Sequence, residues 1–141
     1  MTVILGIDPG TNITGYGIIK LEESKPTYLY HEILKTGLKN MYTVKLSLIY
    51  DNTKWLIEKY KPDDIALESV FFSVNAGTAI KLGQARGAAL SACSGKHRNI
   101  YEYSPRRVKM IITGNGAADK AEVQKYVKKK LRLRRKLEED A

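Results

Sequence analysis

The sequence predicts an α/β fold with a mixed five-stranded sheet and helices on both of its faces. Three short apolar segments come first and are joined by short turns, which indicates an antiparallel meander. Segments of helical periodicity then alternate with two further strand-like segments. A strand that follows a crossover helix can pair in parallel with an earlier strand, so the sheet is expected to be mixed. The length of 141 residues suits one domain over residues 1–141.

The meander begins with an apolar run that ends at Asp8, where Pro9 begins a turn. Apolar residues at helical spacing predict a helix after the meander, and Pro62 marks its end because proline cannot continue a helix. Residues of the next strand alternate between two faces, so that Ala66 and Glu68 share one face. We expect strands over residues 2–8, 15–21, 28–35 and 64–70, and helical apolar positions at Met41, Val44, Leu48, Ile49, Trp55 and Leu56.

Capping residues mark three helices in the second half of the chain. Asn75 is expected to cap a helix that runs to about residue 94, followed by a fifth strand over residues 99–103. Gly83 and Gly87 lower the stability of that helix, so close packing against the sheet or a partner helix is the expected reason for them. The last two helices are indicated by Ser104-Pro105 at a start, Gly114 at an end, and the capping-box spacing of Asp119 and Glu122, with Val123, Val127 and Leu131 facing inward.

The composition indicates a globular protein with a polyanionic partner. The net charge is +9 and the pI is about 9.6, which favours nucleic acid, although a ribosome-associated or simply basic soluble protein would have the same balance. No apolar run is long enough to span a bilayer, and no basic segment precedes the first apolar run as in a signal peptide. Cys93 is the only cysteine, so no internal disulfide can form, and a reducing cytoplasmic setting is expected.

Asp8 ends the first expected strand and Glu68 lies near the end of the fourth, and these two strands can lie side by side. Two carboxylates at one edge of a sheet repel each other unless a cation lies between them. Hard divalent ions such as Mg²⁺ prefer oxygen ligands, and two such ions suit the cleavage of a phosphodiester. Taken singly, Asp-Pro-Gly is typical of a turn and Glu68 of a solvated strand end, but their shared edge favours a metal site.

Phe71 and Phe72 are the only phenylalanines and follow the fourth strand directly. Adjacent residues in extended backbone point to opposite faces, so one of the two is expected to lie exposed beside the acidic pair, where it could stack on or wedge between bases. The alternative is that both cover the edge of the core as a lid. Cations follow at Lys81, Arg86, Arg106, Arg107, Lys109 and Lys120, and eight more crowd residues 125–136, where a phosphate contact competes with a plain solvated helix face.

Several segments of the chain together form a set of sequence motifs. The set opens with Leu5-Gly6-Ile7-Asp8-Pro9-Gly10-Thr11 and Thr14-Gly15-Tyr16-Gly17 and continues through residues 66–72, 75–76, 81–87, 108–109 and 114–120. In order and spacing these motifs resemble the RuvC family of Holliday-junction resolvases, in the ribonuclease-H-like superfamily, and the resemblance covers essentially the whole chain.

The resemblance implies a ribonuclease-H-like fold and a homodimer that nicks a four-way DNA junction symmetrically, with RuvA and RuvB as partners. It implies Mg²⁺, for which Mn²⁺ could substitute, with two ions per subunit held by Asp8, Glu68 and Asp140. Lys109 and Lys120 would contact phosphate and help to stabilise charge in the transition state. DNA contacts are expected from Phe71, Phe72, Lys81, Arg86, Arg106, Lys109 and Lys120.

The C-terminal segment departs from the family pattern. The family carries two acids in an Asp-Ala-x-Asp-Ala-Leu pattern at the start of its last helix, and here only Asp140 matches, so we expect a last helix that is cut short. A non-catalytic junction-binding module is therefore an alternative function. A second alternative is a phosphotransferase of the actin-like class, because residues 7–11 also resemble its phosphate-binding hairpin, but that class needs a second large domain and a second acidic glycine motif.

Overall fold

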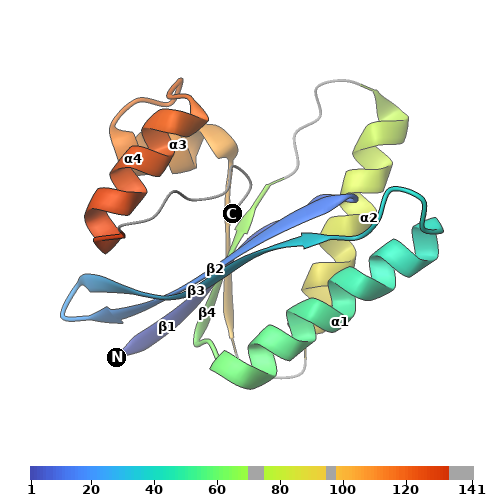
Figure 1. Ribbon diagram of the computed structural model, residues 1–141, viewed down its shortest axis with the longest axis horizontal. Helices are drawn as coiled ribbons and strands as arrows, with labels where there is room; N and C mark the ends of the chain where they lie inside the picture. The colour runs from blue at the N-terminus through green and yellow to red at the C-terminus, as the bar shows by residue number, and fades with distance from the viewer. Residues whose placement is uncertain (70–74, 95–97, 134–141) are drawn as a thin grey trace.

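The fold is a mixed sheet between two helical layers, shown in Figure 1 by a computed structural model that describes residues 1–69, 75–94 and 98–133. The strand order is β3-β2-β1-β4-β5. The first three strands pair antiparallel, whereas β4 pairs in parallel with both β1 and β5, which confirms the predicted mixed sheet. The strands are β1 (Thr2–Asp8), β2 (Ile13–Glu22), β3 (Lys25–Lys35), β4 (Asp64–Glu68) and β5 (Asn99–Tyr103).

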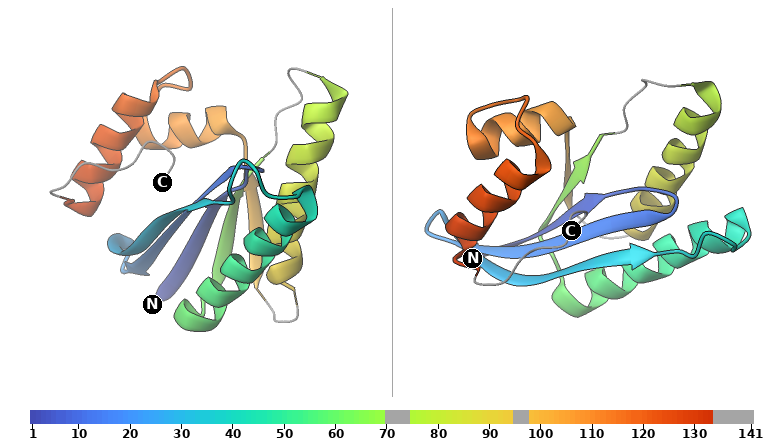
Figure 2. Two further views of the ribbon diagram at one scale, coloured as in Figure 1. Left: turned by 45° about the vertical axis from the view of Figure 1, so that its right-hand side comes forward. Right: turned by 45° about the horizontal axis from the view of Figure 1, so that its top comes forward.

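Helices cover both faces of the sheet, as predicted (Figures 1 and 2). Helices α1 (Tyr42–Tyr60) and α2 (Ala76–Ala92) pack together on one face. Helices α3 (Pro105–Thr113) and α4 (Lys120–Leu131) lie on the other. In the part of the chain that the structure describes, no helix is both long enough and apolar enough to cross a membrane.

Three helices begin at capping residues that the sequence predicted, and α3 ends at the predicted glycine. Asn75, Ser104 and Asp119 each accept a hydrogen bond from a backbone N–H three residues later, which satisfies a donor that the helix itself leaves unpaired. Lys61 and Gly114 end α1 and α3 in left-handed conformations. Local chemistry therefore explains where these helices start and stop.

The hydrophobic core lies between the sheet and the α1–α2 layer. Alternate residues of the central strands point into it and are fully or almost fully buried. Cys93 is also buried there. The core consists of Leu5, Ile7, Tyr16, Ile18, Ile49, Leu56, Ile57, Ile65, Leu67, Ala85, Ala89 and Cys93.

Helix α1 faces the core with only part of its apolar residues. Ile49 and Leu56 are fully buried, whereas Trp55 is 46% exposed. Thr53, by contrast, is fully buried, and two partners satisfy its hydroxyl. This hydroxyl lies 2.7 Å from the hydroxyl of Tyr16, and it donates to the carbonyl oxygen of Ile49 at 2.7 Å. Helical spacing predicted α1 correctly, but four of the six residues that carried it are exposed, namely Met41, Val44, Leu48 and Trp55.

Leu56→Ala is expected to lower the free energy of unfolding by about 2–5 kcal/mol, because it removes a fully buried side chain and leaves a cavity. Urea denaturation followed by circular dichroism measures the change. Leu48→Ala on the same helix is the matched control, since Leu48 is 36% exposed and should cost less than half as much. Equal losses for the two variants would contradict the placement of the core.

Candidate active site at the end of the sheet

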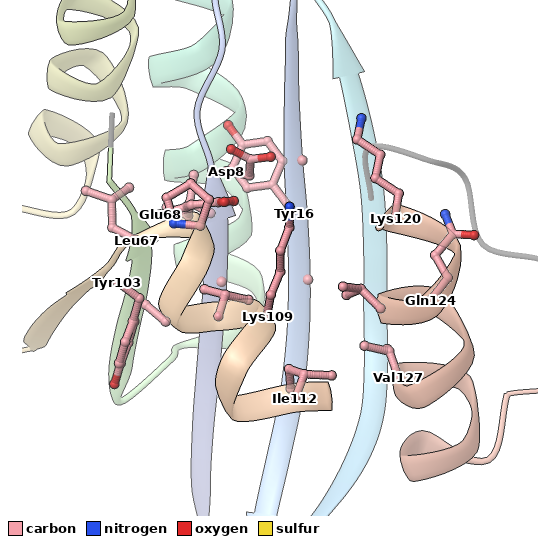
Figure 3. A pocket seen from close by; sticks show the side chains of 18 residues that line it. Asp8, Tyr16, Leu67, Glu68, Tyr103, Lys109, Ile112, Lys120, Gln124 and Val127 are labelled. Carbon is pink, nitrogen blue, oxygen red and sulfur yellow. The ribbon is translucent and has the colours of Figure 1, made fainter. Parts of the chain in front are cut away.

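Asp8 and Glu68 come together at the ends of two neighbouring parallel strands. Ile7 of β1 is in register with Leu67 of β4, so the next residue on each strand turns to the same face. That face is opposite to the core and lies toward α3 and α4. Figure 3 shows the two carboxyl groups close to each other at the edge of this face, which is the arrangement that the sequence predicted.

A cavity of about 550 Å³ separates this face of the sheet from α3 and α4. Its floor is a row of small residues across three strands, because Gly17 pairs with Gly6 and Gly6 pairs with Ala66. A Cβ atom at Gly17 would meet no described atom within 4 Å, so the row leaves open space. The other lining residues include Asp8, Gly15, Glu68, Tyr103, Val108, Lys109, Ile112, Lys120, Val123, Gln124 and Val127.

Two lysines reach the same cavity from the helical layer. Lys109 lies on α3, whose start is fixed by the Ser104 cap, and Lys120 begins α4 directly after the Asp119 cap. In Figure 3 the side chain of Lys109 extends toward the carboxylates, and Lys120 lies across the cavity. The two N-terminal caps fix where α3 and α4 begin, and the packing of these helices above the sheet brings both predicted lysines to the cavity that holds the acidic pair.

The acidic pair has an unusual proton affinity. Burial, the charge of Asp8 and a hydrogen bond with the Asp8 side chain together raise the pKa of Glu68 from 4.5 to about 7, with burial as the largest cause. The positive charges of Lys109 and Lys120 lower this pKa. Burial and the neighbouring carboxyl group therefore leave Glu68 partly protonated near neutral pH.

These two groups fit a divalent cation. Carboxylate oxygens within hydrogen-bond reach of each other can exchange the shared proton for a hard metal ion such as Mg²⁺ or Mn²⁺. Among the described residues, no group of three or more metal-binding side chains occurs, so Asp8 and Glu68 account for two ligands only. The predicted third ligand, Asp140, lies outside the described residues.

Mn²⁺ affinity is expected to rise about tenfold between about pH 6 and pH 8, because binding must displace a proton from Glu68. The pKa of Glu68 is higher in the folded than in the unfolded chain, so the metal-free protein should also lose stability as pH rises from 4.5 to about 7. Titration calorimetry in two buffers of different ionisation enthalpy counts the released proton. In Glu68→Gln the pH dependence should vanish; an unchanged dependence would assign the proton to another group.

The other predicted DNA-binding residues lie away from this cavity or outside the described residues. Lys81 and Arg86 belong to α2, on the opposite face of the sheet. Arg86 forms an ion pair with Glu102 of β5, which balances its charge within the chain. Arg106 lies in the first turn of α3 and packs against the backbone of Gly116. Phe71 and Phe72 lie outside the described residues.

Sequence reasoning missed one polar residue of the cavity. Gln124 lies one helical turn after Lys120 on α4 and lines the cavity beside it. The spacing of four residues places both side chains on one face of the helix, so the prediction of Lys120 as a site residue could also have identified Gln124. The row formed by Gly17, Gly6 and Ala66 had no local signal, because it depends on the register of three strands.

Comparison with known proteins decides the family. The sequence model of the family described as crossover junction endodeoxyribonuclease RuvC matches residues 4–141. The chain belongs to the RuvC family. The RuvC protein of Serratia proteamaculans is 43% identical over all 141 residues, which cover 81% of that protein. The RuvC protein of Colwellia psychrerythraea is 47% identical over 134 residues, which are 94% of this chain and 77% of that protein.

Solved structures of the RuvC family have the same fold. Thermus thermophilus RuvC in complex with a Holliday junction substrate superimposes with a TM-score of 0.89 at 29% identity, over 98% of this chain and 84% of that one. The structure of T. thermophilus RuvC itself gives a TM-score of 0.84 at 30% identity, over 96% and 84% of the two chains. The ribonuclease-H-like mixed sheet implied by the resemblance is therefore confirmed.

Proposed function

We propose that this chain is a metal-dependent endonuclease that nicks four-way DNA junctions during recombination and repair. The observation that carries the proposal is the carboxyl pair Asp8 and Glu68, which faces Lys109 and Lys120 across an open cavity. The net charge of +9 supplies long-range attraction for DNA. Membership of a family of crossover junction endodeoxyribonucleases supports the same activity.

The metal proposed for the site is Mg²⁺, with Mn²⁺ as a substitute and two ions per subunit. Asp8, Glu68 and Asp140 would hold these ions, and the ions would supply an activated water and charge stabilisation for phosphodiester hydrolysis. Asp8 and Glu68 bind through carboxylate oxygens, which Glu68 offers fully only when it has lost its proton. The third ligand is proposed from the family resemblance.

The residues around the acidic pair provide binding and orientation. Lys109 and Lys120 carry positive charge into the cavity, where it would attract a DNA phosphate and stabilise the negative charge that develops on it. Phe71 and Phe72 follow β4, the strand that ends in Glu68, so they are proposed to contact bases beside the cut site. Lys81, Arg86 and Arg106 are proposed to contact the DNA backbone farther from the cut.

The proposed assembly is a homodimer that contacts through α2. A Cβ atom at Gly83 or Gly87 would meet no described atom within 4 Å, so close packing against the described part of the chain does not account for these glycines. Ile80 on the same helix is 61% exposed. A second copy of α2 would bury this face and give two equivalent sites for the two like strands of a junction. RuvA and RuvB are proposed as partners, and the cytoplasm as the location.

The test is strand nicking of a synthetic four-way junction, with a linear duplex of the same sequence as the control substrate. Mg²⁺ should give symmetric nicks in the junction, and chelation by EDTA should stop them while binding persists. Junction binding without nicks in either Mg²⁺ or Mn²⁺ would favour the alternative of a non-catalytic module. Measurable ATP affinity without junction binding would favour a phosphotransferase.

A further inference from the structure

The loop that leaves Asp8 is folded tightly back on itself. Asp8 forms the last pair of the β1–β2 ladder, with Gly15, and the backbone reverses between them. A Cβ atom at Gly10 would lie 2.3 Å from the carbonyl oxygen of Ile13, so no side chain fits at this position. The loop therefore has a definite, compact shape immediately beside the proposed metal ligand.

One buried hydroxyl group holds both backbone polar groups of Gly10. The hydroxyl of Thr14 donates to the carbonyl oxygen of Gly10 at 2.9 Å and accepts from the N–H of Gly10 at 3.2 Å. Thr14 is fully buried. Only Pro9, whose ring fixes φ, separates Gly10 from Asp8. The position of Gly10 therefore restricts the backbone of Asp8 from the loop side, as the sheet does from the strand side.

The outer half of the same loop is tied to β3 and α1. The hydroxyl of Thr36 donates to the carbonyl oxygen of Thr11 at 2.6 Å. The backbone N–H of Thr36 donates to the carbonyl oxygen of Asn12 at 3.0 Å. The ammonium group of Lys45 donates to Oδ1 of Asn12 at 2.5 Å. Thr36 and Lys45 are both buried. Two buried polar side chains, one on α1 and one on the residue that follows β3, therefore converge on one short loop.

We propose that Thr14 is a positioning residue for Asp8: its buried hydroxyl clamps the loop after Asp8 and so sets the direction of that carboxylate. This inference rests on the proposed metal-dependent nuclease function. Thr14 contacts neither metal nor DNA; it acts through the backbone of Gly10 and Pro9. Partners that orient a metal ligand in this way typically affect metal affinity by about 10- to 100-fold.

The test compares variants that differ in the hydroxyl group alone. Thr14→Val has nearly the shape of threonine and lacks the hydroxyl, and it should weaken Mn²⁺ binding, measured by electron paramagnetic resonance of the free ion, by about tenfold or more. Thr14→Ser should bind Mn²⁺ as the native protein does, and Thr14→Ala should not. The matched control is Thr53→Val, because Thr53 is equally buried but its hydroxyl bonds to Tyr16 and Ile49 in the core.

Each outcome decides the role of Thr14. Weaker Mn²⁺ binding by Thr14→Val and Thr14→Ala, with native binding by Thr14→Ser and Thr53→Val, supports the clamp. Native Mn²⁺ affinity in Thr14→Val overturns it, as does an equal loss in Thr53→Val. If Thr14→Val does not fold, the pair Thr14→Ser and Thr14→Ala still isolates the hydroxyl. Failure of the native protein itself to bind Mn²⁺ or to nick junctions would instead refute the proposed function.

Discussion

Asp8→Asn and Glu68→Gln are each expected to reduce junction nicking by about 1,000-fold or more, while junction affinity changes little. Each substitution removes one charged metal ligand and keeps the size of the side chain, so the loss falls on catalysis. DNA binding depends mainly on the surplus of basic side chains, which these changes leave in place. Single-turnover nicking rates and a gel-shift titration at fixed salt measure the two quantities separately.

Asp8→Asn is also expected to change the melting temperature of the metal-free protein. Above the pKa of Glu68, both carboxyl groups are charged in the metal-free protein and repel each other. Asp8→Asn should therefore raise the melting temperature at about pH 8 without metal, because it removes that repulsion. Asp51→Asn, an exposed acid on α1, is the control and should change neither nicking nor stability appreciably. Nicking at the native rate by Asp8→Asn would remove Asp8 from the mechanism.

Lys109→Ala is expected to lower the nicking rate by about 100-fold, because the variant loses the positive charge that we propose lies next to the reacting phosphate. The charge of Lys109 also lowers the pKa of Glu68, so its removal should move the pH dependence of Mn²⁺ binding toward higher pH. Lys109→Arg keeps the charge and should restore that pH dependence at least in part. Nicking rates at saturating Mg²⁺, together with calorimetric titration of Mn²⁺ against pH, test both consequences.

Lys125→Ala is the matched control for Lys109→Ala. Lys125 lies on α4 and is exposed, but it does not line the cavity. Its removal should weaken junction binding slightly and reduce the dependence of binding on salt, with little effect on the rate of the bound complex. If Lys125→Ala and Lys109→Ala reduced nicking equally, Lys109 would contribute only general attraction for DNA.

Local signals in the sequence predicted most of the elements and the acidic half of the site. Asn75, Ser104 and Asp119 cap helices because each side chain bonds to a backbone N–H three residues away, an interaction that needs no tertiary contact. The order of strands and crossover helix predicted Asp8 beside Glu68, because it allows β4 to pair in parallel with β1, as it does in the structure. These inferences depend on short-range geometry and on topology, and both can be read along the chain.

Tertiary packing decided what each side chain does once the elements are assembled. Helical periodicity could not show that Thr53 is buried while Trp55 is 46% exposed, because burial depends on which side of α1 meets the sheet. The charge of Arg86 suggested a DNA contact, and nothing in the sequence indicated that Arg86 also pairs with Glu102, sixteen residues away along the chain. Contacts of this kind arise only when separate elements meet.

By itself, the sequence determined the fold class, the family and the pair of acids at one end of the sheet. Only the tertiary structure decided that Gly17, Gly6 and Ala66 line up to leave a cavity, and that the lysines of α3 and α4 overlook it. Only the structure decided that the hydroxyl of Thr14 holds the loop after Asp8. The physical reason is range: caps and periodicity act over a few residues, whereas cavities and loop anchors depend on strand register and on packing between layers.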